Sequence, residues 1–229
     1  MHGIPCFSGK DFMKFNVFKK RSEKFLSKYG LGHGLKKNLQ NINISDISVA
    51  NLHIGCGNIH IKNWCNVDIL ATGATDLICD IKSLDGIPPG SVGRIYTCHV
   101  LEHFATAEIA PILKKWFDAL KPGGEIRISV PDLDAITKIY QDNIDHFQVP
   151  GHQPWIALIY GGQKDEYDFH KTGFNFCWLK YVLDGIGFED VKRYQNEPHF
   201  IENVIDNSTA KSFGEYISLN VVARKPLIS

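Results

Sequence analysis

Two histidines and a glutamate are closely spaced in the motif HVLEH, residues 99–103. The spacing matches H-x-x-E-H, in which two histidines on one helix bind zinc and the glutamate activates water. That chemistry needs a long helix and a third ligand further along the chain. Here His99 directly follows a strand-like run. A zinc-dependent hydrolase using His99, Glu102 and His103 is therefore an alternative hypothesis, and we assign no metal ligand.

Two glycines stand directly after an apolar run in residues 52–58, LHIGCGN. Glycines at such a place let the backbone turn sharply and approach a bound ligand closely. A second apolar run, residues 66–69 (NVDI), contains Asp68 near its end. A carboxylate there can accept hydrogen bonds from both hydroxyls of a ribose. Together, the two motifs predict a site for a ligand that contains a nucleoside.

The motifs depart from the dinucleotide-binding fingerprint G-x-G-x-x-G at two places. His60 stands where the third glycine would be, and Asp68 lies only eleven positions after Gly57. The ribose acid of a dinucleotide site usually lies about 20 residues onward, after a full helix. A pyrophosphate needs the N-terminus of that helix, whereas a ligand made of an amino acid and an adenosine needs it less. The spacing favours S-adenosylmethionine over NAD or FAD.

Short apolar runs separated by loop residues indicate the elements that position these motifs. Buried parallel strands are expected at residues 50–54, 65–69, 75–78, 94–97 and 125–130. Helical spacing over residues 106–120 ends at the turn KPGG, residues 121–124. Further helices are expected near residues 132–140, 155–160 and 176–185, followed by strands at 188–194 and 216–223. We predict an α/β fold: a Rossmann-like, doubly wound sheet, mostly parallel with an antiparallel edge hairpin.

The N-terminal segment differs in charge from the rest of the chain. Residues 1–40 hold nine basic residues against two acidic ones, although the 229-residue chain has 25 of each. Phe12, Phe15 and Phe18 fall near helical spacing. We predict a basic amphipathic helical arm at 1–40 and a single domain at 41–229. Two interpretations of the arm stay open: a solvated helix face, or a lid that attracts an anionic substrate.

Composition excludes several broad classes of protein. Hydrophobic residues make up 44% of the chain, but no window approaches the roughly 18 uninterrupted apolar residues of a membrane span. The balanced charge argues against a nucleic-acid coat protein. The N-terminus lacks the apolar core of a secretory signal, and the six cysteines form no C-x-x-C pair. We expect a soluble, cytoplasmic protein with no nucleic-acid partner and no membrane span.

Four segments, in this order and spacing, resemble the class I S-adenosylmethionine-dependent methyltransferases: residues 52–58, 66–69, 99–104 and 120–124. The resemblance covers roughly residues 50–135. More narrowly, the chain is similar to small bacterial methyltransferases associated with polysaccharide or sugar modification. These also carry motifs like VPDL at residues 130–133 and FHK at residues 169–171. One departure is His53, where many family members have an acid two positions before the first glycine.

The resemblance implies that eight residues bind the cofactor. They are Gly55, Cys56 and Gly57 at the methionine part, Asp68 at the ribose, Asp80 and Ile81 beside the adenine, and His99 and Leu101 closing the pocket. Each type also has a structural explanation. The glycines could form an ordinary turn, Asp68 could cap a strand end, and Asp80 could cap a helix.

Methyl transfer to a hydroxyl requires a base, and the candidates are His103, His170 and Asp132, with Glu102 as a weaker one. An amine acceptor needs no base, so the choice between oxygen and nitrogen stays open. We expect a small-molecule acceptor, a sugar or nucleotide-linked sugar among the candidates, and the basic arm favours an anionic one. A non-catalytic cofactor-binding module is the other alternative. The oligomeric state is open, and a homodimer is one option.

Overall fold

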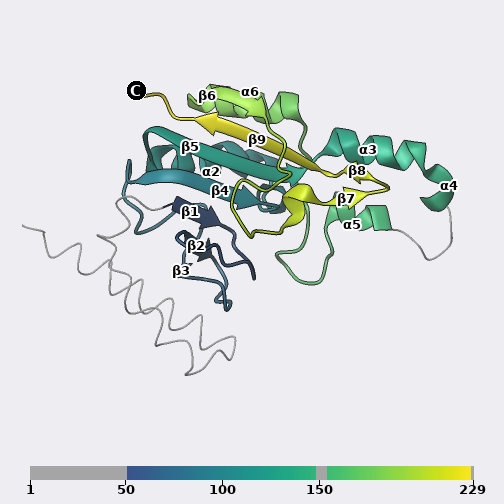
Figure 1. Ribbon diagram of the computed structural model, residues 1–229, viewed down its shortest axis with the longest axis horizontal. Helices are drawn as coiled ribbons and strands as arrows, with labels where there is room; N and C mark the ends of the chain where they lie inside the picture. Colours follow the sequence, from purple (N-terminus) through teal and green to yellow (C-terminus); the bar gives the residue numbers. More distant parts are fainter. Residues whose placement is uncertain (1–50, 148–153, 228–229) are drawn as a thin grey trace, which may run out of the picture. The chain divides into compact units, whose positions relative to one another are not determined.

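The computed structural model describes residues 51–147 and 154–227 (Figure 1). The basic arm predicted for residues 1–40 lies outside the described residues. Its helical character and its boundary with a single domain at 41–229 therefore stay predictions. No helix within the described ranges is long and apolar enough to cross a membrane.

Seven strands form one sheet in the order β3-β2-β1-β4-β5-β9-β6 (Figure 1). Their bounds are β1 Asn51–Ile54, β2 Cys65–Asp68, β3 Leu77–Ile78, β4 Val92–Cys98, β5 Leu120–Pro131, β6 Glu189–Arg193 and β9 Ser218–Arg224. The first five strands are parallel, and β9 runs antiparallel between β5 and β6. The predicted Rossmann-like sheet, mostly parallel with an antiparallel pair at one edge, is confirmed.

Two helices that contact each other pack against one face of the sheet: α2 (Thr106–Ala119), between β4 and β5, and α6 (Phe176–Ile186), before β6. As predicted, α2 carries apolar side chains at helical spacing, and Ile109, Leu113 and Trp116 are fully buried. The Trp116 indole N–H donates to the carbonyl oxygen of Ile81 at 2.8 Å. This hydrogen bond ties α2 to the loop that follows β3.

A second group of short elements lies beyond the carboxyl ends of β4 and β5 (Figure 1). It consists of α3 (Leu133–Asp142), α4 (Ile144–Phe147), α5 (Pro154–Tyr160) and the hairpin of β7 (Lys211–Ser212) and β8 (Glu215–Tyr216). Ile136 and Ile139 of α3 pack with Ile217 in a small apolar cluster, separate from the main core. The group therefore forms a rim at the edge where the parallel strands end.

The turn after α2 differs in one respect from the sequence expectation. The segment 121–124 was expected only to end a helix, but β5 already begins at Leu120, because Leu120 pairs with Val92. The ladder is irregular across the turn and resumes where Arg94 pairs with Glu125. Gly124 is required at this place, since a Cβ there would lie 2.8 Å from the carbonyl oxygen of Lys121.

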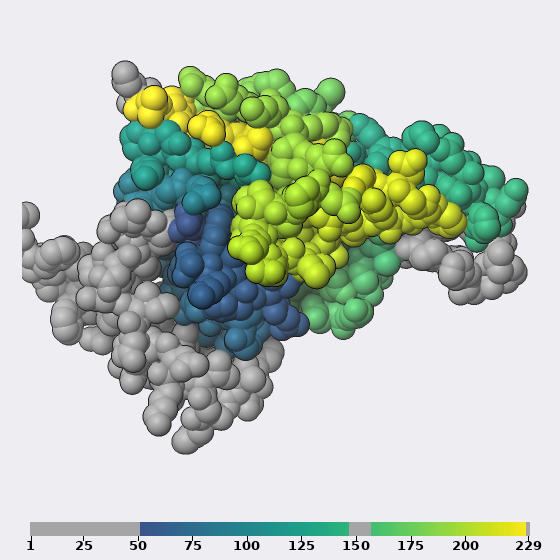
Figure 2. Space-filling view, in the orientation of Figure 1, coloured from purple at the N-terminus to yellow at the C-terminus, as the bar shows by residue number. Residues whose placement is uncertain are grey.

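The face of the sheet opposite α2 and α6 carries a polar row. The strand register sets Asn66 of β2, His53 of β1, Tyr96 of β4 and Arg127 of β5 side by side, and paired residues point to the same face. The Arg127 guanidinium lies 4.1 Å from the centroid of the Phe200 ring. Phe200 belongs to the connection between β6 and β9, which lies against the β1–β2 region in Figure 2. This connection covers the polar side chains of that face, which would be unfavourable against an apolar layer.

The connection from β1 to β2 contains no helix, as the spacing of Gly57 and Asp68 predicts. Asn66, fully buried in β2, makes the hydrogen bonds that close this connection. Its Oδ1 accepts from the Ile61 N–H at 2.9 Å and lies 3.0 Å from Nδ1 of His53. Its Nδ2 donates to the carbonyl oxygens of Ile61 and Trp64 and to the Asp76 carboxylate. One side chain thus satisfies backbone groups that a helix would otherwise pair.

Replacing this amide should destabilise the protein strongly. We expect Asn66→Ala to lower the free energy of unfolding by about 3 kcal/mol, because buried donors and acceptors lose their partners. Urea denaturation would measure this change, with Asn58→Ala as the control because Asn58 is exposed in the same connection. An Asn66→Ala protein as stable as the Asn58→Ala protein would contradict the role given to the amide.

Candidate active site

Loops after β1, β2, β3 and β4 meet at the carboxyl edge of the sheet and enclose a cavity of about 470 Å³, here named the strand-end cavity. Six residues predicted to form the site line it: Gly55, Asp68, Asp80, Ile81, His99 and His103. Parallel strands bring these residues together because all their carboxyl ends lie at the same edge. Val100, Phe104 and Lys171 line the same cavity, although none was expected there as a ligand residue.

Asp68 is oriented by the backbone around it. Its Oδ2 accepts from the N–H of Gly57 at 2.8 Å, and its Oδ1 accepts from the N–H of Leu70 at 2.9 Å. A carboxylate oxygen has room for further hydrogen bonds. Both oxygens of Asp68 can therefore bind a ligand that enters the strand-end cavity.

Glycine is the only residue type that fits at position 55. Its φ of +70° lies in the left-handed region, and a Cβ there would lie 2.3 Å from Cγ2 of Val100. Any side chain would collide with Val100, which itself lines the cavity. The glycine thus brings the backbone after β1 directly against the residue that follows β4.

Two residues expected at the cofactor lie elsewhere. Cys56 is buried and lines a separate cavity of about 310 Å³, where burial raises the pKa of its thiol to about 11. Leu101 is fully buried in the main core, and Val100 lines the strand-end cavity instead. The reason is the 3-10 helix η3 (Leu101–His103), in which side chains three positions apart align. Val100 and His103 face the cavity together, while Leu101 points into the core.

The H-x-x-E-H motif does not form the zinc site of a hydrolase. His99 precedes η3 with a φ of +54°, and η3 spans only three residues, so His99 and His103 share no long helical face. The ring of His99 instead lies against Ser218 of β9, with Nε2 2.8 Å from Oγ. Burial and, to a smaller degree, the neighbouring His170 together lower the pKa of His99 to about 4. The imidazole is neutral at pH 7.

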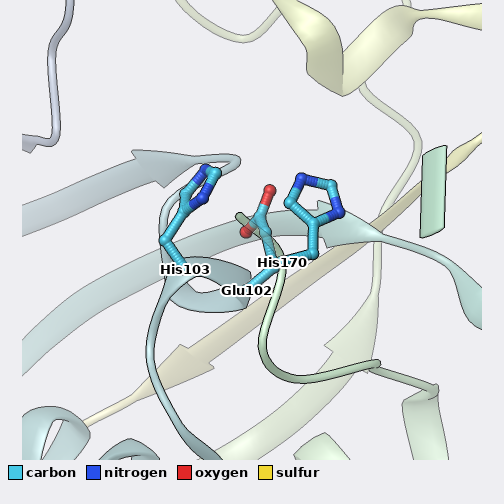
Figure 3. A group of neighbouring side chains, drawn as sticks. All are labelled: Glu102, His103 and His170. Carbon is cyan, nitrogen blue, oxygen red and sulfur yellow. The ribbon is translucent and has the colours of Figure 1, made fainter. Parts of the chain in front are cut away.

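His103, His170 and Glu102 form a cluster beside the strand-end cavity (Figure 3). The two imidazole rings meet edge to face, with centroids 5.1 Å apart. Burial lowers the pKa of both histidines. Burial also raises the pKa of Glu102 to about 8. His103 and His170, predicted separately as candidate bases, are thus brought together.

Asp132, the third candidate base, lies outside this cluster. It caps the N-terminus of α3, where its Oδ1 accepts from the N–H of Asp134 at 3.2 Å. Its Oδ2 accepts from the Arg193 guanidinium at 2.8 Å. The carboxylate is 5% exposed and does not line the strand-end cavity. A structural role accounts for all the contacts described for Asp132.

A buried network that the sequence does not reveal lies in the connection between β6 and β9. Asp206 accepts hydrogen bonds from the Tyr96 hydroxyl and from Ser208, and its Oδ2 lies 3.3 Å from Nε2 of His199. Burial opposes the charge of Asp206, but these hydrogen bonds outweigh burial and hold the pKa of the carboxyl below its ordinary value. Asp206 also lines the cavity that contains Cys56. No local pattern signals this network, because Tyr96 and Asp206 are 110 positions apart.

Several solved structures of methyltransferases align with this chain at low sequence identity. A SAM-dependent methyltransferase from Methanosarcina mazei aligns with a TM-score of 0.50 and 17% identity, over 78% of this chain and 92% of that one. One from Archaeoglobus fulgidus aligns with a TM-score of 0.49 and 15% identity, over 93% and 99%. CurJ carbon methyltransferase aligns with a TM-score of 0.45 and 16% identity, over 78% of this chain. The chain spans about half the length of CurJ and of the methyltransferase SibL, 49% and 53%.

No family model matches the chain, and no curated protein matches it in sequence. The comparisons with solved structures therefore define a class of fold. The chain has the Rossmann-like fold that the Methanosarcina mazei methyltransferase also has.

The Asp206 network should make stability depend on pH at the acidic end. At pH 7 we expect Asp206→Asn to lower the free energy of unfolding by about 1–3 kcal/mol, because charge-assisted hydrogen bonds are lost. A carboxyl whose pKa is lowered by folding stabilises the protein above its unfolded pKa, about 3.8. The difference between variant and wild type should therefore shrink as the pH falls below about 4.

Urea denaturation between pH 3 and pH 7 would measure this effect, with Glu202→Gln as a control in the same connection, where Glu202 is exposed. A deficit of Asp206→Asn that stays constant down to pH 3 would contradict it.

Proposed function

We propose that this chain is an S-adenosylmethionine-dependent methyltransferase acting on a small-molecule acceptor. The observation that carries the proposal is the carboxylate of Asp68, oriented by the N–H groups of Gly57 and Leu70 at the strand-end cavity. An acid at the end of the second strand can accept hydrogen bonds from both hydroxyls of a ribose. The fold shared with a SAM-dependent methyltransferase from Methanosarcina mazei supports the same assignment.

The residues around the strand-end cavity suit an adenosyl ligand with an amino-acid end. A volume of about 470 Å³ is within the usual range for small-molecule sites. Asp80 and Ile81 line it beside Asp68, where an adenine would follow the ribose. On the other side of the cavity, Gly55 presents only backbone atoms to Val100. The connection after Gly57 has no helix N-terminus for a pyrophosphate, which favours this ligand over NAD.

Methyl transfer asks the protein mainly for alignment. When bound, S-adenosylmethionine supplies a methyl group on a sulfonium sulfur, and transfer breaks the carbon–sulfur bond with its electron pair left on sulfur. A site that holds donor and acceptor in line supplies most of the acceleration. For a hydroxyl acceptor, the oxygen forms the new bond to carbon, and its proton must leave. His103 and His170 are the candidates to accept that proton, because burial lowers their pKa values and so favours the unprotonated ring that a base requires.

The nature of the acceptor belongs to the proposal as well. The paired histidines favour a hydroxyl acceptor over an amine, which would need no base. A sugar or nucleotide-linked sugar, suggested by the sequence resemblance, satisfies this requirement. A cytoplasmic location stays a prediction, and the oligomeric state stays open, with a homodimer as one option.

The cofactor assignment is tested by thermal denaturation with S-adenosylmethionine, S-adenosylhomocysteine or NAD added separately. A ligand at 100 times its dissociation constant adds about 2.7 kcal/mol to stability. We expect both adenosyl compounds to raise the melting temperature, NAD to leave it unchanged, and Asp68→Ala to abolish the shift.

Asp145→Ala is the matched control, because Asp145 is an exposed acid of α4 and does not line the strand-end cavity. A shift with NAD alone would overturn the assignment. So would adenosyl binding that is unchanged in Asp68→Ala.

A further inference from the structure

The carboxylate of Glu102 is buried without a partner. Glu102 is 1% exposed, and no other described residue donates a hydrogen bond to either carboxylate oxygen. Nδ1 of His99 lies 3.4 Å from Oε1, outside hydrogen-bond geometry. Among the described residues, no lysine or arginine forms an ion pair with Glu102. Burying both carboxyl oxygens without a partner is unfavourable whether the group is charged or protonated, so the arrangement indicates a ligand that would pair with it.

Backbone hydrogen bonds bring His170 to this carboxylate. The carbonyl oxygen of Glu102 accepts from the N–H groups of Lys171 and Thr172, at 2.6 and 3.2 Å. The Thr172 hydroxyl also donates to the carbonyl oxygen of Phe104 at 2.8 Å. The segment after α5 is thereby joined to η3 along its length. His170 faces His103 across the Glu102 carboxylate as a result (Figure 3).

The three side chains offer a compact set of metal ligands. One ligand atom from each of Glu102, His103 and His170 lies within 4.8 Å of the others. Bonds of about 2.1 Å in a tetrahedral site place ligand atoms about 3.4 Å apart, so small side-chain movements would close the set. Nδ1 of His103 lies 3.2 Å from the carbonyl oxygen of Phe169. Donation of Nδ1–H to that oxygen leaves Nε2 as the free ligand, a common arrangement in metal sites.

We propose that Glu102, His103 and His170 bind a divalent transition-metal ion. Two imidazole nitrogens and one carboxylate oxygen suit zinc, iron(II) or manganese(II), whereas magnesium prefers oxygen ligands alone. Three protein ligands leave at least one coordination position open, as in catalytic sites. This set differs from the H-x-x-E-H zinc motif in two ways: His170 takes the place of His99, and Glu102 is a metal ligand rather than the residue that activates water.

The location of the metal site indicates which ligand would fill its open coordination position. His103 lines the strand-end cavity, and His170 lines a neighbouring cavity of about 250 Å³ whose wall is mostly apolar. A metal between them would hold the hydroxyl oxygen of an acceptor between the two cavities. With both histidine rings bound to the metal, neither ring accepts the proton, so in this form of the site the metal replaces them in activating the acceptor. The metal would lower the pKa of that hydroxyl, and its proton would leave to bulk water. The oxygen would then form the bond to the methyl carbon as the carbon–sulfur bond breaks. This role rests on the proposed methyltransferase function, whereas metal binding itself does not.

Calorimetric titration of the full-length protein, first freed of metal by a chelator, tests the site with zinc chloride and magnesium chloride as separate probes. We expect about one zinc ion to bind per chain, and we expect this binding to depend on the three side chains. Magnesium should give no heat of binding. Glu102→Gln, His103→Gln and His170→Gln should each weaken zinc binding at least 10-fold. His146→Gln is the matched control, because His146 is an exposed histidine on α4. Glu102→Gln keeps the size of the side chain and removes only its charge.

The open position is tested with the cobalt(II)-substituted protein and acetohydroxamate, a small oxygen ligand. We expect acetohydroxamate to shift the visible absorption bands of bound cobalt. No stoichiometric zinc in the wild type, or zinc binding unchanged in all three variants, overturns the metal site. Cobalt bands that acetohydroxamate leaves unchanged overturn the role in holding the acceptor.

Binding of S-adenosylmethionine to the same preparations separates this inference from the proposed function. Adenosyl binding that depends on Asp68, without zinc binding, would refute the metal site and leave the methyltransferase proposal standing. Zinc binding without adenosyl binding would support the metal site and refute methyl transfer.

Discussion

The ligand-facing edge of this sheet depends on the hydrogen bonds of one buried amide. In most α/β crossovers a helix pairs the backbone groups between two parallel strands, but here Asn66 pairs them with its side chain. Asp68 follows two positions later on the same face of β2, and its carboxylate receives the N–H of Gly57 from the other end of the connection. The amide and the acid therefore fix the same loop from two sides. Because this short loop has no helix, it offers no helix N-terminus to a pyrophosphate, which agrees with the proposed adenosyl ligand.

The two faces of the sheet are stabilised by different interactions. Burial of apolar side chains holds α2 and α6 to one face, with Trp116 at its centre. On the other face, cross-strand pairing aligns polar side chains such as His53 and Tyr96. The connection between β6 and β9 covers them and supplies Asp206 as a hydrogen-bond acceptor for Tyr96. A buried polar layer is stable only when its groups are paired, which explains why a long connection lies there.

The candidate site combines two functions through a single turn of 3-10 helix. Because this helix has three residues per turn, Val100 and His103 face the strand-end cavity together. Leu101 between them enters the core, and Glu102 turns toward His170. Four consecutive residues thus close the proposed cofactor cavity, anchor the loop and supply two of the proposed metal ligands. A regular α-helix, with 3.6 residues per turn, would turn these side chains in other directions.

The sequence by itself determined most strands and helices of the sheet layer and the edge of the sheet at which the proposed site lies. Apolar periodicity predicted α2 and the parallel strands, and the spacing of Gly57 and Asp68 predicted a connection without a helix. These signals are local, since they depend on neighbours within a few turns or one crossover. The tertiary structure alone decided the direction of Leu101 and the capping role of Asp132.

The tertiary structure also decided which distant side chains meet. His103 and His170 were predicted as separate candidates, and only the fold joins them around Glu102. Tyr96 and Asp206 were not paired by any pattern in the sequence. Such contacts depend on strand register and on the path of long connections, which no window of neighbouring residues contains. A shift of one residue in register would turn each side chain of a strand to the other face. These contacts between distant side chains therefore depend on the folded sheet as a whole.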